Sequence, residues 1–298
     1  MDGFLNLLKP PGMTSHDMVG LARRVLGVKK IGHAGTLDPG AAGVLPVAVG
    51  RATRLIEYLS PVGKSYRAEV AFGMATDSGD DTGKAIEKMD SFEMPGEDAL
   101  RLAMQQMTGI LRQVPPAFSA IKVHGQKACD LARKNVAVDL PEREVHIRSF
   151  RLLARRERSL LVDVDCSKGT YIRSLCADLG KKLGIPATMS FLVRMRVGSF
   201  HLADAHTVEE FRGMGEAALL APELCLAHLP RYDLPGTRIR PFCNGLPTED
   251  RHLAARREES GLWRVFSKGI FLGIGRLDES GSLSSEKLYV TQEAGMAL

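Results

Sequence analysis

The chain has 298 residues, of which 44% are hydrophobic and 25% are charged, and these proportions exclude an intrinsically disordered protein. Its 40 basic and 35 acidic residues leave a net charge of +5, which permits a polyanionic partner without requiring one. No stretch approaches the ~20 apolar residues of a membrane helix, and the N-terminus shows no signal peptide. We therefore expect about two domains in a cytoplasmic protein that contacts no membrane.

The cysteines show no sign of a metal site or a disulfide framework. The chain has 5 of them, none in a C-x-x-C pair and none followed by a histidine at the spacing of zinc ligands. Because an odd count without a secretion signal favours reduced thiols, the sequence predicts a cytoplasmic setting and no structural metal.

Helix and strand patterns follow each other from the N-terminus. Thr14 and Asp17 stand at the spacing of a capping box and precede apolar residues at helical intervals. They predict a helix that Gly27 ends. Residues 66–72 alternate strictly between inward and outward side chains, which predicts a strand.

The middle of the chain continues in the same way. Apolar residues at helical intervals over 100–107 predict a helix closed by Gly109. Residues 160–166 alternate and predict a second strand. A glycine turn follows, and residues 172–183 carry the spacing of a helix that Gly184 ends.

The last third of the chain divides at a turn-rich seam. A capping box predicts a helix over residues 208–220, and prolines and a glycine mark a linker over 230–236. Short apolar runs separated by glycines follow, so the C-terminal part is predicted to be rich in strands. Strands and helices mix without βαβ alternation, which indicates an α+β fold with domains over residues 1–232 and 233–298.

The loop over residues 32–47 carries the densest functional signal. It holds several glycines, a histidine, a threonine and Asp38. Glycines let the backbone bend sharply or lie close to a ligand, and the proline after Asp38 keeps that residue out of a helix. An Asp-Pro pair alone most often makes a local Asx-turn. The histidine, the threonine and the apolar neighbours favour a functional carboxylate instead.

Four further segments hold candidate functional residues. Tyr66 opens the first strand, and alone it would be an ordinary core tyrosine. Arg173 falls in the first turn of a helix, where a solvated surface arginine is the usual finding. A proline-rich stretch over residues 114–127 carries two lysines. Between residues 143 and 158 arginines predominate, which is typical of a solvated face and also fits a phosphate-binding stripe.

In this order, residues 32–47, 64–67, 115–127 and 167–173 resemble the bacterial tRNA pseudouridine-55 synthases, the TruB family. Four ordered motifs are far more specific than any one of them. The resemblance covers nearly the whole chain, although residues 233–298 resemble the family's PUA domain more weakly. It implies a catalytic domain with a central, mostly antiparallel sheet flanked by helices, and a small β-rich PUA-like domain.

The resemblance also implies roles for individual residues. Asp38 matches the catalytic aspartate, Tyr66 the tyrosine that stacks on the base, and Arg173 the arginine that pairs with the aspartate. His33 matches the residue that replaces the extruded base, and Leu192 an apolar residue of the pocket floor. Other substrate-binding positions implied in this way are Tyr171, Asp80 and Lys64. The candidates for contacts with the RNA backbone are Lys122, Lys127, Arg148, Arg151 and Arg155.

The implied reaction breaks the N1–C1′ bond of uridine, turns the uracil and joins C5 to the same sugar carbon, so no cofactor is expected. An ionised Asp38 could attack C1′, attack C6 or remove the C2′ proton, and the sequence leaves these routes open. An ion pair with Arg173 would favour the ionised carboxylate. A phenol with a pKa of about 10 is a reluctant base, so stacking ranks above proton transfer for Tyr66.

The implied partner is the T-arm of tRNA, bound by a monomer without a guide RNA. Three alternatives stay open: a relative that works in a guide-RNA particle, an RNA-folding chaperone, and another Asp-dependent enzyme such as a glycoside hydrolase. The last would need a second carboxylic acid near Asp38. The chain departs from the family at Ala42, where threonine is usual, and at Cys129, where tyrosine is usual.

Overall fold

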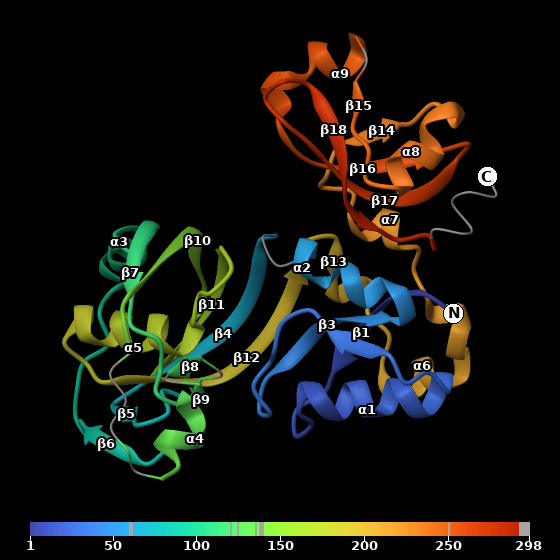
Figure 1. The fold of residues 1–298 in the computed structure, drawn as a ribbon. Coiled ribbons are helices and arrows are strands. Elements are labelled where there is room, and N and C mark those ends of the chain that lie inside the picture. Colours follow the sequence, from blue (N-terminus) through green and yellow to red (C-terminus); the bar gives the residue numbers. More distant parts are fainter. Residues whose placement is uncertain are drawn as a thin grey trace.

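The computed structural model describes residues 1–59, 62–119, 121–123, 125–134, 136, 140–249 and 251–291. It confirms the α+β fold, with one large mixed sheet flanked by helices and a second, smaller sheet near the C-terminus (Figure 1). No helix in these ranges is long and apolar enough to cross a membrane.

The large sheet has nine strands and is mostly antiparallel, as predicted. Its strands are β1 (Gly3–Lys9), β2 (Ile31–His33), β3 (Ala42–Val49), β4 (Lys64–Phe72), β7 (Gly109–Gln113), β10 (Arg143–Arg155), β11 (Ser159–Cys166), β12 (Ala187–Val197) and β13 (Phe200–His201). The main path runs in the order β1-β3-β12-β4-β11-β10-β7.

The two halves of this sheet meet at a short parallel pairing between β3 and β12. Only Ala42 and Gly43 of β3 take part, opposite Val193 and Arg194. Gly43 has a φ of 116°, and a Cβ atom there would lie 2.3 Å from the carbonyl oxygen of Arg194. A side chain at this position would therefore separate the two half-sheets.

We expect Gly43→Ala to lower the free energy of unfolding by about 3 kcal/mol or more, because it combines backbone strain with a clash against a neighbouring strand. Gly40→Ala is the matched control, since a Cβ atom at Gly40 meets no atom within 4 Å. Urea unfolding of both variants measures the difference. Equal stability of the two would show that the close approach of β3 and β12 does not require glycine.

Helices pack on both sheets. They are α1 (Ser15–Leu26), α2 (Ile56–Leu59), α3 (Glu97–Gln105), α4 (Ala128–Ala132), α5 (Ile172–Leu183), α6 (Val208–Met214), α7 (Pro222–Cys225), α8 (Ile239–Cys243) and α9 (Arg251–Ala255), with 3-10 turns at η1 (Gly50–Leu55), η2 (Leu202–Asp204), η3 (Gly215–Ala218), η4 (Gly236–Arg238) and η5 (Arg257–Glu259). Helices α3 and α5 pack on β4, β10, β11 and β12, whereas α1 packs on β1 and β3.

Two predicted helices end earlier than the sequence indicated. The helix over 100–107 ends at Gln105, and Gly109 instead begins β7 with a φ of 93°. The helix predicted over 208–220 ends at Met214, because Gly215 has a φ of 55° and the chain continues as a 3-10 turn. In contrast, the capping box of Thr14 and the left-handed Gly27 bound α1 as predicted.

The C-terminal part is a five-stranded sheet in the order β14-β16-β17-β18-β15, which confirms the β-rich prediction. Its strands are β14 (Arg231–Asp233), β15 (Thr248–Glu249), β16 (Gly261–Ser267), β17 (Ile270–Leu277) and β18 (Ser282–Leu288). The boundary predicted between residues 232 and 233 falls inside β14, which pairs with β16.

Two small hairpins complete the fold of the described residues. One pairs β5 (Met74–Thr76) with β6 (Ala85–Lys88), and the other pairs β8 (Lys122–Val123) with β9 (Gln126–Lys127). The side chains of Lys122 and Lys127, two predicted RNA contacts, lie outside the described part of the structure. The same holds for the side chain of Cys129.

Candidate active site

Asp38 lies in the loop between β2 and β3, at the junction of the two half-sheets. The preceding residue, Leu37, is buried, and its amide donates a 2.9 Å hydrogen bond to the hydroxyl of Ser15 in α1. A turn closes behind Asp38, where its carbonyl accepts a hydrogen bond from Ala41. The loop is therefore anchored on both sides, while the Asp38 side chain keeps 40% of its surface exposed.

Arg173 is the ion-pair partner of Asp38, as predicted. Its Nε lies 3.1 Å from Oδ2 of Asp38, and its side chain is only 5% exposed. The two terminal nitrogens donate to the carbonyls of Ser78 and Phe118, each at 2.8 Å. A guanidinium held at three points fixes the orientation of the carboxylate it contacts.

Gln113 fixes the start of the helix that carries Arg173. Its side-chain amide donates to the carbonyl of Tyr171 at 3.0 Å and accepts from the Tyr171 amide at 2.8 Å. Tyr171 is the residue that precedes α5, so this pair of hydrogen bonds ties the helix to the end of β7.

Asp80 supports the arginine from its other side. Its Oδ2 lies 3.9 Å from a terminal nitrogen of Arg173. Burial raises the pKa of Asp80, but hydrogen bonds from Thr82 and Ser78 and the charge of Arg173 outweigh it and hold the pKa below its usual value. Asp80 is therefore ionised at neutral pH, and its charge helps to balance that of Arg173.

A pocket of about 270 Å³ opens beside the Asp38 carboxylate. Six of the eight substrate-contacting residues predicted from the sequence line it: Asp38, Lys64, Tyr66, Tyr171, Arg173 and Leu192. The other two, His33 and Asp80, are not among its lining residues. His33 ends β2, and burial together with the charges of Arg194 and His16 lowers its pKa.

Tyr66 and Lys64 reach the pocket from β4. Tyr66 is 8% exposed, and burial raises the pKa of its phenol although Arg194 lies close enough to hydrogen-bond with it. Burial and the charge of Arg194 lower the pKa of Lys64 to about 8. The pocket thus brings together one carboxylate, the buried ring of Tyr66, and cations around them.

Comparison with known proteins shows to which family the chain belongs. Residues 23–172 match the family described as "TruB family pseudouridylate synthase (N terminal domain)". Residues 173–221 match "tRNA pseudouridylate synthase B C-terminal domain", and residues 230–289 match "Pseudouridine synthase II TruB, C-terminal". The chain belongs to the TruB family of pseudouridylate synthases.

Relatives in this family cover most of the chain. The "tRNA pseudouridine synthase B" of Moorella thermoacetica is 46% identical over 93% of this chain and 94% of its own length. The protein of the same name from Symbiobacterium thermophilum is 50% identical over 83% of each chain. Membership of the TruB family makes this chain an isomerase.

Solved structures agree on the fold. A chain of the "Crystal Structure of a Cbf5-Nop10-Gar1 Complex" superimposes with a TM-score of 0.74 and 25% identity, covering 98% of this chain and 86% of that one. A chain of the "Structure of H/ACA RNP bound to a substrate RNA containing 2'-deoxyuridine" has a TM-score of 0.73 at 24% identity, with the same coverage.

Two buried cations that the sequence analysis did not single out hold the Asp38 loop of this TruB-family chain. Arg194 is fully buried and donates to the carbonyls of Val44, Thr36 and Gly35 at 2.8, 3.2 and 3.1 Å. It thereby ties the residues on both sides of Asp38 to β12. The sequence could have indicated this role, because Arg194 stands among apolar residues. An arginine in such a strand is buried only when its donors are satisfied.

Lys9 is the second cation that holds this loop. It is fully buried and donates to the carbonyls of Pro10, Met13 and Pro39 at 2.9, 2.6 and 3.1 Å. Burial lowers its pKa to about 8. Because Pro39 follows Asp38 directly, Lys9 and Arg194 together fix the backbone that presents the TruB-family carboxylate.

The predicted RNA-backbone arginines lie on β10, away from the pocket lining. Arg148 pairs with Asp165 at 2.8 Å, and Arg155 donates to the carbonyl of Met94 at 3.1 Å. The side chain of Arg151 is exposed and makes no hydrogen bond or ion pair with the residues described. The guanidinium groups of two of the three are thus engaged within the protein, and that of Arg151 is exposed.

The family departure at Ala42 falls at the junction of the half-sheets, where Ala42 pairs with Val193 of β12. The departure at Cys129 concerns a side chain outside the described residues.

Proposed function

We propose that this chain converts the T-loop uridine at position 55 of tRNA to pseudouridine. One observation carries the proposal: the Asp38 carboxylate is held by Arg173 at 3.1 Å and opens into a pocket that Tyr66 and Leu192 also line. The names of the relatives, "tRNA pseudouridine synthase B", support tRNA as the substrate.

The proposed reaction is an isomerisation without oxidation or reduction. The N1–C1′ bond breaks, the C5–C1′ bond forms, a proton leaves C5 and N1 gains one. Asp38 acts as the ionised carboxylate, by attack on C1′, by attack on C6 or by removal of the C2′ proton. Arg173 is the positioning residue that holds the carboxylate in one orientation in all three routes.

The uridine must leave its stack to reach this pocket, at a cost of a few kcal/mol. We infer that Tyr66 offsets part of this cost by stacking on the flipped uracil, which contributes about 1–3 kcal/mol. The raised pKa of the Tyr66 phenol supports stacking over proton transfer, because a buried phenol ionises even less readily than a free one. His33 fills the gap that the base leaves in the RNA.

Tyr66→Phe separates these two roles. If the ring stacks, this variant forms pseudouridine at a rate within about tenfold of wild type, whereas Tyr66→Leu loses roughly 1–3 kcal/mol of transition-state binding. Single-turnover rates on a tRNA transcript measure both. A Tyr66→Phe rate as low as that of Tyr66→Leu would instead assign the phenol hydroxyl to proton transfer.

We propose that the protein acts as a monomer in the cytoplasm, without a guide RNA. Its catalytic domain spans residues 1–232. A PUA-like domain over residues 233–298 contacts another part of the tRNA. A tRNA-folding chaperone role can coexist with catalysis at a separate step.

The deciding experiment incubates the purified chain with an unmodified tRNA transcript and no other RNA, and then maps pseudouridine at single-nucleotide resolution. We expect one modified position, in the T-loop. Modification only after a guide RNA is added would contradict the stand-alone enzyme, and no modification with tight tRNA binding would favour a chaperone.

A further inference from the structure

The hydroxyl group of Ser119 is buried near Asp38 without a hydrogen-bond partner. Ser119 is 4% exposed and lines the same pocket as Asp38 and Arg173. Within the described part of the chain, three buried side-chain polar atoms lack a partner, on Asn6, His33 and Ser119, and of these residues only Ser119 lines the pocket. A buried polar group is rarely left unpaired, because it has lost its hydrogen bonds to water. The Ser119 hydroxyl therefore indicates a partner that arrives with the ligand of this pocket.

The start of α5 holds the segment that carries Ser119. A terminal nitrogen of Arg173 donates to the carbonyl of Phe118 at 2.8 Å, and the next residue of α5 donates through its hydroxyl to the carbonyl of Val114, also at 2.8 Å. The Nε of Arg173 lies 3.1 Å from Oδ2 of Asp38. One guanidinium group thus contacts both the carboxylate and the residue that precedes Ser119, so Ser119 is held close to the place where a ligand meets Asp38.

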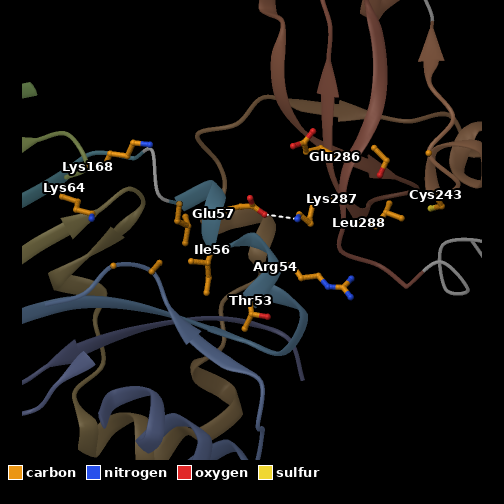
Figure 2. A pocket seen from close by; sticks show the side chains of 15 residues that line it. Thr53, Arg54, Ile56, Glu57, Lys64, Lys168, Cys243, Glu286, Lys287 and Leu288 are labelled. Atoms are coloured by element: carbon orange, nitrogen blue, oxygen red, sulfur yellow. Dashed lines mark ion pairs between the residues drawn. The ribbon is translucent and has the colours of Figure 1, made fainter. Parts of the chain in front are cut away.

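The neighbouring cleft towards the C-terminal sheet offers charged side chains instead. It meets the Asp38 pocket at Lys64, which lines both hollows, and Lys168 also lines the cleft (Figure 2). Ser119 does not line this cleft. Cations are suited to phosphates, whereas a flipped base is recognised by hydrogen bonds to the polar atoms along its edge. We therefore expect the partner of Ser119 on the uracil and not on the RNA backbone.

Negative charge develops on the uracil in each of the three routes open to Asp38. If C1′ is attacked or the C2′ proton is removed, the electron pair of the N1–C1′ bond stays with the uracil. If C6 is attacked, the electron pair of the C5=C6 bond moves towards O4. The charge is shared with a carbonyl oxygen in every case, and a hydrogen bond to a charged oxygen is stronger than one to a neutral oxygen. A hydroxyl donor at that oxygen therefore stabilises the reacting uracil more than the bound one.

The uracil must also turn before C5 can join C1′. A half-turn about the ring axis through N3 and C6 brings C5 to the place of N1 and exchanges O2 with O4. A donor beside one carbonyl oxygen before the turn therefore meets the other one afterwards. Because the hydrogen of a serine hydroxyl rotates to suit its acceptor, one hydroxyl can bond the uracil in both orientations.

We propose that the hydroxyl of Ser119 donates a hydrogen bond to one carbonyl oxygen of the flipped uracil, and to the other carbonyl oxygen after the uracil has turned. The inference rests on the proposed function and adds a substrate-contacting residue to it. The hydroxyl keeps its proton throughout, so the bonds and protons exchanged in the isomerisation are unchanged. The proline-rich stretch over residues 114–127 thereby contributes a polar group to the pocket.

Ser119→Ala tests the proposal in the full-length chain, with an unmodified tRNA transcript as the substrate. We expect the single-turnover rate of pseudouridine formation to fall about ten- to a hundredfold, because a hydrogen bond to a charged oxygen is lost. The Kd for tRNA should change by less than about threefold, because phosphate contacts dominate the affinity. The urea midpoint of unfolding should not fall, because the variant removes a buried hydroxyl that has no partner in the free protein.

Ser267→Ala is the matched control. Ser267 in β16 is 1% exposed, and its hydroxyl donates to the carbonyl of Leu234 at 2.7 Å. This variant should lower the urea midpoint, because the carbonyl of the buried Leu234 loses its donor, and it should leave the single-turnover rate of the folded protein unchanged. A serine with a structural role thus affects stability, whereas a serine that contacts the substrate affects the rate.

Sulfur substitution of the target uridine tests the contact itself. Sulfur accepts hydrogen bonds more weakly than oxygen, so 2-thiouridine or 4-thiouridine at the target position should weaken the bond from Ser119. For at least one of them, Ser119→Ala and the sulfur atom together should slow the reaction less than the product of their separate effects.

Three results would overturn the assignment of Ser119: an unchanged rate in Ser119→Ala, a fall of its urea midpoint as large as that of Ser267→Ala, or fully multiplicative effects with both thiouridines. The wild-type chain on the unsubstituted transcript keeps the two questions apart. If it forms no pseudouridine, the proposed function is contradicted instead.

Discussion

We expect Asp38→Asn to abolish pseudouridine formation, with a loss on the order of 10³–10⁴-fold or more in single-turnover rate. The carboxamide fills nearly the same space and still reaches the pocket, but it is neither a nucleophile nor a base. tRNA affinity should stay within about tenfold of wild type, because the RNA-binding cations are unchanged. The rate is measured by release of tritium from C5-labelled uridine in a tRNA transcript.

Asp204→Asn is the control for this variant, since Asp204 is an exposed carboxylate in η2 that does not line the catalytic pocket. It should react at the wild-type rate. Turnover by Asp38→Asn at more than a few per cent of the wild-type rate would remove Asp38 from the catalytic role, whichever of the three chemical routes applies.

The sequence predicts best those helices and strands whose ends or faces depend on residues close together in the chain. The capping box at Thr14 and the left-handed Gly27 determine α1 almost alone, and the strict alternation of residues 66–72 determines most of β4. The arginine-rich β10 was not predicted as a strand, because bulges near Ser149 and Ala154 break its alternation. Nor does any local pattern indicate the parallel pairing of β3 with β12, which depends on segments about 150 residues apart.

The residues of the candidate site also differ in how far the sequence predicts them. Asp38, Tyr66 and Arg173 lie in ordered motifs, and the structure brings them into one pocket. Lys9 and Arg194 were not foreseen because their partners are backbone carbonyls, which every residue has and which leave no mark in the sequence. Arg155 of the basic stretch was predicted to contact RNA from its charge, and its guanidinium donates to the carbonyl of Met94 within the protein, a contact that charge alone does not indicate.

Arg173→Lys has the second-largest expected effect. A lysine ammonium keeps the charge, but it cannot reach Asp38 and the carbonyls of Ser78 and Phe118 together, as the planar guanidinium does. We expect the single-turnover rate to fall about 10²–10³-fold, and the free energy of unfolding to fall by about 1–3 kcal/mol because a buried carbonyl loses its donor.

A purely structural role for Arg173 would reduce stability and leave the chemistry of the folded fraction intact, so two further measurements separate the roles. Added guanidinium should partly restore the rate of Arg173→Ala, because the small cation can occupy the vacated site beside Asp38. The double variant Asp38→Asn/Arg173→Lys should be about as slow as Asp38→Asn alone, because an arginine that acts through the carboxylate has no effect once the carboxylate is gone. Additive losses, or no rescue by guanidinium, would mean that Arg173 contributes to catalysis independently of Asp38 or only through folding.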